Sequence, residues 1–189
     1  MPRILIVYAT SYGQTEKIAR TLAEHLRASS LEVTLADAKA FPAAIDPATF
    51  DGIIIGASII ARGHQPAAAA FIRTHRAVLE RLPAAFFSVC ASAGSTFERA
   101  RQAARVLRDE FLRHAGWQPD LRVTFAGAVN FTRYGFLLRW YMKKASAMNG
   151  GSTDTTRDHE YTDWSAVEQF ARDFTQLLTA EVRPAEARV

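Results

Sequence analysis

A turn rich in hydroxyl side chains follows the first apolar run of the chain. Residues 3–8 are typical of a strand buried on both faces, and a helical spacing of apolar residues begins at Ile18. Between them lie Thr10, Ser11, Tyr12, Gly13, Gln14 and Thr15. A strand, a turn and a helix in this order direct unpaired backbone N–H groups and the positive end of a helix dipole at one point, which attracts phosphate. The turn therefore predicts a phosphate site, and the plainer alternative is a helix with Thr10 or Ser11 as its N-cap.

The composition of this turn excludes two classes of nucleotide site. It contains no lysine and no G-x-x-x-x-G-K-[ST] pattern, which a P-loop needs to hold a triphosphate. It also lacks the G-x-G-x-x-G pattern of a dinucleotide site. The remaining pattern, T-x-x-G-x-T, suits a phosphomonoester held without lysine or metal. It resembles the phosphate loop of flavodoxins, which hold FMN.

Two more apolar runs end in small or polar residues. We expect buried strands over Asp51–Ser58 and Ala84–Cys90, and in a parallel sheet their carboxyl ends meet the first turn at one edge. The predicted contacts of the flat flavin ring are Ser58, Ile59, Ile60, Cys90, Ala91, Ser92, Ala93 and Gly94. His64 is a candidate proton relay at this edge, although a solvated loop histidine is the plainer interpretation. Cys90 fits a buried small hydrophobe better than a reactive group.

The remaining patterns complete an α/β chain. Helices are expected over Gln14–Ser29, Pro66–Arg81, Thr96–Ala115 and Asp163–Ala180, and further strands over Leu31–Ala36 and Leu121–Val129. Five strands that alternate with helices predict a doubly wound five-stranded parallel sheet. One domain should span residues 1–182, and residues 183–189 should form a loose tail.

A long insertion, about residues 130–162, separates the last predicted strand from the last helix. No carboxylate occurs from Arg122 to Thr153, whereas cations and aromatic residues are frequent there. On a helical wheel one face collects Leu137, Leu138, Tyr141, Met142, Ala145 and Met148, and the opposite face has Arg139, Lys143 and Ser146. This predicts a short basic amphipathic helix that stops at Asn149–Gly151, and the plainer alternative is a helix packed on its own domain.

Several motifs together carry a more specific resemblance. They are Ile55-Gly56-Ala57-Ser58-Ile59 with Gly63-His64, the basic aromatic insertion, Gly150 to Thr155, and Tyr161-Thr162-Asp163-Trp164. Over residues 3–180 the chain is similar to the flavodoxin-like, quinone-dependent protoporphyrinogen oxidases of bacterial haem synthesis. The resemblance implies FMN, protoporphyrinogen IX as substrate, and menaquinone or ubiquinone as acceptor at the inner face of the cell membrane. It further suggests Gly151 and Thr153 as FMN contacts, and Arg133, Tyr134 and Arg139 as substrate contacts, the arginines as partners of propionates. Asp154 is expected to close over the flavin or to cap a turn.

Composition limits the alternatives. The net charge is +4 and the isoelectric point about 9.5, whereas flavodoxins that shuttle electrons are typically acidic. The single cysteine and the short apolar runs favour a cytoplasmic protein, which the basic insertion would hold at the membrane surface. No metal-ligand spacing and no nucleic-acid motif is visible, and an oligomer is possible. A flavodoxin-type electron carrier or a general FMN quinone reductase is the second hypothesis, and a binding module without redox activity is the third.

Overall fold

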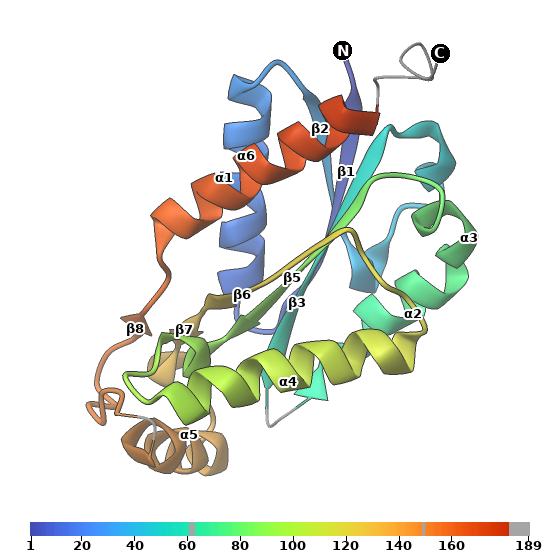
Figure 1. Cartoon of the computed structure of the whole chain (residues 1–189). Helices are drawn as coiled ribbons and strands as arrows, with labels where there is room; N and C mark the ends of the chain where they lie inside the picture. Colours follow the sequence, from blue (N-terminus) through green and yellow to red (C-terminus); the bar gives the residue numbers. More distant parts are fainter. Residues whose placement is uncertain (61–62, 149, 182–189) are drawn as a thin grey trace.

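Five parallel strands form the centre of the computed structural model, which describes residues 1–60, 63–148 and 150–181 (Figure 1). The sheet order is β2-β1-β3-β5-β6, and the strands are β1 (Arg3–Ala9), β2 (Glu32–Asp37), β3 (Gly52–Ile60), β5 (Ala84–Cys90) and β6 (Leu121–Ala126). From β1 the chain continues to β2 on one side of β1 and then crosses to β3 on the other side of β1. The loops after β1 and β3 therefore separate at the carboxyl edge, where doubly wound sheets bind ligands. The predicted sheet is confirmed, while residue 182 and the predicted tail 183–189 lie outside the described residues.

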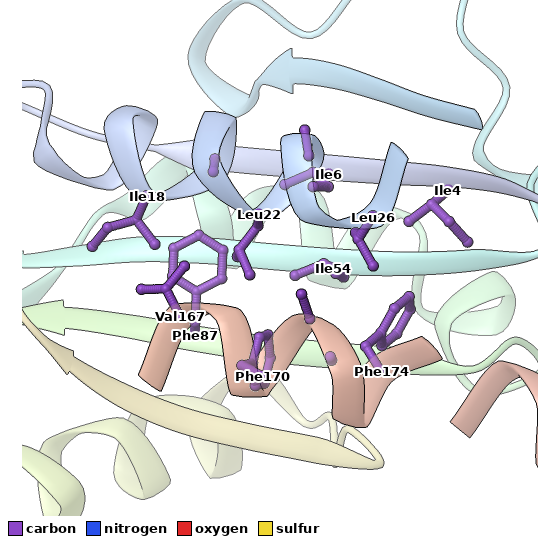
Figure 2. Packing of buried hydrophobic residues seen from close by; sticks show 14 of the residues in the cluster. Ile4, Ile6, Ile18, Leu22, Leu26, Ile54, Phe87, Val167, Phe170 and Phe174 are labelled. Atoms are coloured by element: carbon purple, nitrogen blue, oxygen red, sulfur yellow. The ribbon is translucent and has the colours of Figure 1, made fainter. Parts of the chain in front are cut away.

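Helices cover both faces of the sheet. α1 (Gln14–Ala28) and α6 (Trp164–Glu181) lie on one face, and α2 (Pro66–Thr74), α3 (Arg76–Leu79) and α4 (Glu98–Ala115) lie on the other (Figure 1). Figure 2 shows the first layer, in which apolar side chains of both helices meet those of the sheet. The fully buried members include Ile4, Ile6, Ile18, Leu22, Leu26, Ile54, Phe87 and Phe174. This apolar packing fixes both helices on the sheet and so sets where α1 begins.

Short 3-10 turns and a two-residue strand connect these elements. The turns are η1 (Ala38–Ala40), η2 (Pro47–Thr49), η3 (Ala91–Gly94) and η4 (Phe131–Arg133). Strand β4 (Gly63–His64) pairs antiparallel with the end of β3, so that Ile59 lies opposite His64. This hairpin lengthens the carboxyl end of β3 at the edge where the first turn also lies.

Two predicted elements are interrupted. The helix expected over Pro66–Arg81 is broken at His75, whose ring packs against Phe41 and Phe71 while α3 starts afresh. The strand expected over Leu121–Val129 stops at Gly127, because the chain passes close to β5 there. A Cβ on Gly127 would lie 3.0 Å from Val89 Cγ1. Beyond the break, β7 (Ala128–Val129) leaves the sheet and pairs antiparallel with β8 (His159–Glu160).

The insertion forms a helix at the carboxyl ends of the strands. α5 (Phe136–Met148) is at the bottom of Figure 1, and its Leu138 and Met142 pack against an apolar cluster that includes Val129 of β7. The predicted division of its faces is partly wrong, since Leu137 and Met148 are exposed and Ser146 is buried. Two hydrogen bonds near the C-terminal end of α5 turn Ser146 inward. Ser146 Oγ donates to Ser152 O at 2.6 Å, and Gly151 N donates to Ser146 O at 2.8 Å. Asn149, the first residue of the predicted stop, lies outside the described residues.

Candidate functional site

A cavity opens at the carboxyl edge of the sheet, between the loop after β1, the ends of β3 and β5, and the insertion. Most of the residues predicted to bind FMN line it: Thr10, Tyr12, Gln14, Thr15, Ser58, Ile59, Ile60, Cys90, Ala91, Ser92, Gly94 and Gly151. Tyr134, predicted to contact substrate, lines it as well. Segments far apart in the chain therefore form one site, as the sheet topology requires.

The first turn has the geometry of an anion site. Gly13 is the N-cap of α1 with a φ of 92°, a conformation that favours glycine, and no side chain caps the helix. Neither Thr10 nor Ser11 is therefore the N-cap; Thr10 Oγ1 instead accepts a hydrogen bond from Gly13 N at 3.0 Å. Thr15 Oγ1 is buried and has no hydrogen-bond partner among the described residues. A phosphate oxygen at the helix N-terminus would supply that partner.

A second buried hydroxyl lines the cavity at the end of β3. Ser58 Oγ has no partner in the described part of the chain. Across the cavity, Cys90 Sγ lies 2.9 Å from Ser92 Oγ, and Gly94 lies close to Tyr161. A Cβ on Gly94 would lie 2.9 Å from Tyr161 Cβ, so a larger residue at position 94 would push the two segments apart. These loops suit a flat ligand with polar atoms at its edge.

The insertion closes one side of the cavity with apolar groups. Leu138, Met142 and Ala145 of α5 line it beside Tyr134. Buried Phe131 and Tyr134 pack with Tyr12, whose ring meets that of Tyr134 edge to face at 4.7 Å. Burial raises the pKa of the Tyr134 hydroxyl, which accepts a hydrogen bond from Asn130 N at 3.1 Å. The phenol therefore stays neutral and is part of the largely apolar wall on this side of the cavity.

The two predicted substrate arginines lie beside the cavity and donate to backbone oxygens. Arg133 Nη1 donates to Tyr12 O at 3.1 Å, and Asn130 Nδ2 donates to the same oxygen at 3.2 Å. Arg139 donates to Phe131 O at 2.9 Å and to Tyr134 O at 3.0 Å. Neither arginine lines the cavity. The bonds to Tyr12 attach the insertion to the first turn. The bonds of Arg139 hold Phe131 and Tyr134 against α5 within the insertion.

His64 does not line the cavity. Its Nε2 lies 2.8 Å from Ser88 Oγ, and its ring stacks on Phe111 of α4 at 4.3 Å. Burial lowers its pKa to about 4, so the imidazole is neutral at physiological pH. The geometry therefore makes His64 a packing residue that holds the β3–β4 hairpin against α4.

Other predicted contacts lie around the rim, and several residues of the cavity were missed. Ser11, Gly13, Ala93 and Thr153 do not line it. Asp154 caps a turn by accepting from Thr156 Oγ1 at 2.5 Å and from Thr156 N at 3.0 Å, and these hydrogen bonds lower the pKa of its carboxyl. The sequence reasoning missed Asn130, Leu138, Met142 and Tyr161 as site residues. The apolar face of the predicted helix was the available indication for Leu138 and Met142, whereas the role of Asn130 depends on a contact across the fold.

Two features are absent from the described residues. No helix in the ranges 1–60, 63–148 and 150–181 is long and apolar enough to cross a bilayer. No group of three or more histidine, cysteine or acidic side chains in the same ranges is suited to a metal ion.

Comparison with known proteins places this chain among flavodoxin-like enzymes. The profile of the flavodoxin domain family matches residues 5–156. The protoporphyrinogen IX dehydrogenase [quinone] of Escherichia coli K12 is 33% identical over 177 residues, which are 93% of this chain and 96% of that protein. The protein of the same name from Leishmania major is 34% identical, over 97% of this chain and 79% of the relative.

Solved structures agree on the fold. A flavodoxin from the domain Archaea aligns with a TM-score of 0.52 at 13% identity, over 94% of this chain and 99% of that one. The rubredoxin oxygen:oxidoreductase of Desulfovibrio gigas aligns with a TM-score of 0.57 at 18% identity, over 96% of this chain and 37% of that one. The match to the flavodoxin domain family implies a flavin cofactor. This chain belongs to the family of flavodoxin-like, quinone-dependent protoporphyrinogen IX dehydrogenases and is a flavoprotein oxidoreductase.

Proposed function

We propose that this enzyme binds FMN and oxidises protoporphyrinogen IX to protoporphyrin IX, with a membrane quinone as electron acceptor in haem synthesis. The observation that carries the proposal is the apolar wall that α5 adds to the cavity, through Leu138, Met142 and Ala145. A flavodoxin-type carrier needs only the loops that hold its flavin. A broad apolar macrocycle needs an apolar surface beside the flavin, and the insertion provides one.

The residues of the cavity fit FMN. Thr15 Oγ1, which has no partner among the described residues, and the uncapped start of α1 would hold the phosphate, and Ser58 Oγ would meet the polar edge of the ring. When bound, FMN would supply the redox chemistry, accepting two electrons in each of three turnovers. Tyr134, Leu138 and Met142 would keep water from the site and orient the macrocycle. Pairing of Arg133 and Arg139 with the propionates remains a prediction.

The exposed side of α5 supports a peripheral contact with the membrane. Phe136, Leu137 and Trp140 are 83%, 79% and 56% exposed, and Tyr141 and Met148 extend the same surface. Arg133, Arg139, Lys143 and Lys144 belong to none of the ion pairs recorded for the described residues. Exposed apolar groups beside cations that have no carboxylate partner among the described residues suit the surface of an anionic bilayer. We propose that the enzyme docks there, at the cytoplasmic face, where quinone is available.

The test is oxidation of protoporphyrinogen IX by the FMN-loaded enzyme under anaerobic conditions, in detergent with a short-chain quinone. Porphyrin fluorescence should rise with quinone and stay near background without it. A Leu138→Ser/Met142→Ser variant should keep FMN and lose the rate by more than about tenfold, because its wall no longer excludes water. Ala147→Ser, on an exposed position of the same helix, is the matched control and should keep the rate.

Two results would contradict the proposal. One is a wild-type rate no faster than that of the same anaerobic mixture of substrate and quinone without enzyme. The other is a double variant that oxidises porphyrinogen at the wild-type rate, which would favour a general quinone reductase or an electron carrier.

A further inference from the structure

Two cations from outside the first turn donate to its backbone oxygens. Arg133 Nη1, from η4 of the insertion, donates to Tyr12 O at 3.1 Å. The ammonium of Lys39, from η1 after β2, donates to Thr10 O. Residues 10–15 contain no charged side chain of their own. The positive charge that the turn lacks in sequence is therefore brought to it by two distant segments.

The position of Arg133 places its charge at the start of α1. A Cβ on Gly13, the N-cap, would lie only 3.7 Å from Arg133 Nη1. The guanidinium therefore lies against the backbone at which the unpaired N–H groups of the helix begin.

Neighbouring carboxylates form no recorded ion pair with these two cations among the described residues. Asp37, two residues before Lys39, accepts a hydrogen bond from the backbone N of Lys39 at 2.9 Å. Glu16 pairs with Arg20 at 2.6 Å, and Lys17 pairs with Glu160 at 2.6 Å. The carboxylate recorded next to η4 is Asp158, which accepts from Thr132 N at 2.9 Å and from Thr132 Oγ1 at 2.8 Å. The ion pairs found in the described part of the chain include neither Arg133 nor Lys39.

A cation on a peptide oxygen also acts through the peptide unit. The oxygen of Thr10, which Lys39 contacts, shares its peptide group with the N–H of Ser11. A positive charge on the oxygen polarises the peptide, so the N–H on its other side becomes a better donor to an anion. Direct Coulomb attraction adds to this effect, because a flavin phosphate carries up to two negative charges at neutral pH. Gly13 N, which shares its peptide group with the oxygen of Tyr12, already donates to Thr10 Oγ1, so Arg133 acts on the anion by its charge alone. A flavin without the phosphate gains nothing from either effect.

We propose that Arg133 and Lys39 select for the phosphate of the cofactor, so that the site prefers a phosphomonoester flavin to the same flavin without phosphate. Arg133 thereby makes the insertion part of the cofactor site. The inference rests on the flavin site of the proposed function and adds the residues that discriminate between flavins. Asn130 Nδ2 and the ring of Tyr134 also contact Tyr12, so the insertion holds the residue whose oxygen Arg133 contacts.

The experiment compares the dissociation constants of FMN and riboflavin, measured by quenching of flavin fluorescence in the full-length apoprotein. Arg133→Gln should weaken FMN binding roughly three- to tenfold and leave riboflavin binding nearly unchanged, and Lys39→Gln should act in the same direction. Arg133→Lys keeps the charge and should retain most of the preference. Arg113→Gln removes the same charge near the far end of α4 and should leave both constants at the wild-type values. Added salt should weaken FMN binding less in Arg133→Gln than in the wild type.

A second measurement needs no variant. Coupling between two sites is reciprocal, so bound phosphate should stabilise the insertion that holds Tyr12. Amide hydrogen exchange in Phe136–Met148 should slow more with saturating FMN than with saturating riboflavin.

The outcomes separate this inference from the proposed function. If the wild type binds neither flavin, the flavin site itself is wrong and both proposals fail. If it binds FMN but Arg133→Gln weakens both flavins equally, Arg133 only braces the turn and the selection is disproved. An unchanged ratio in Arg133→Gln, or equal protection of α5 by both flavins, would overturn the inference alone.

Discussion

Helices α1 and α5 are both amphipathic by sequence, yet their apolar faces have different neighbours. Ile18, Leu22 and Leu26 of α1 are fully buried between the sheet and α6 (Figure 2). On α5, by contrast, Phe136 and Leu137 remain mostly exposed while Leu138 and Met142 face the cavity. The periodicity of a helix shows that it has an apolar face. It does not show whether that face belongs to the core, to a ligand or to a membrane.

This difference distinguishes the sheet and its covering helices, whose apolar residues stabilise the fold, from the insertion, whose apolar residues are available to contact other molecules. The sheet and its covering helices bury their apolar residues and hold the first turn in place. The insertion is joined to the rest of the molecule at a few polar points, including the hydrogen bonds from Arg133 and Asn130 to Tyr12 O, and presents apolar groups on two sides. Substitutions of the same kind should therefore have different consequences in the two parts.

The largest expected effect concerns the same substitution on the two helices. Leu22→Ala on α1 should lower the free energy of unfolding by about 3 to 4 kcal/mol, because it leaves a cavity in a fully packed layer. Leu137→Ala on α5 should change it by less than about 0.5 kcal/mol, because the side chain is already in solvent. Urea denaturation followed by circular dichroism measures both values. Equal losses would show that α5 is packed in solution as firmly as α1.

The free energy of unfolding should depend on pH because of His64, which lies on β4 of the sheet. Its pKa in the folded state is about 4, lowered by burial, while that of an unfolded histidine is about 6.5. Between these values the unfolded chain binds a proton that the folded chain does not, so stability falls as the pH falls from about 6.5 to 4. His64→Gln removes this contribution, so its stability should fall by about 2 to 3 kcal/mol less than that of the wild type over this range.

Urea denaturation at a series of pH values provides the measurement. The matched control is His114→Gln on the exposed side of α4, which should retain the pH dependence of the wild type. If His64→Gln and the wild type lose stability in parallel, the buried imidazole is not the group that titrates.

The sequence predicted what depends on local pattern. Apolar runs that alternate with helical spacings were enough to predict the five-stranded sheet. The polar turn after Ala9 and the strand ends at Ser58 and Cys90 predicted the edge at which the cavity lies. Two interruptions were not predictable. The break at Gly127 comes from close approach to Val89, and the break at His75 coincides with packing of its ring against Phe41 and Phe71.

The insertion shows the same limit at the site. Its helix was predicted, but its rotation depends on Ser146 reaching Ser152, which spacing alone does not reveal. The contact of Arg133 with Tyr12 joins residues 121 positions apart. The basic and aromatic composition showed that the insertion differs from the rest of the chain. Which group each of its cations contacts depends on the tertiary fold.

The smallest expected effect concerns vesicle binding by exposed apolar residues of α5, compared with an exposed apolar residue of α4. A Phe136→Ala/Leu137→Ala variant should bind anionic vesicles about tenfold more weakly than the wild type, because it loses apolar area that would enter the interface. Val106→Ala, an exposed apolar residue on α4 outside the insertion, is the matched control and should bind as the wild type does. Vesicle co-sedimentation at two salt concentrations measures the partition, and salt should weaken it because Lys143 and Lys144 attract anionic headgroups. Vesicle binding that both variants keep at the wild-type level would mean that α5 does not face the membrane, and its exposed apolar side would then need another occupant.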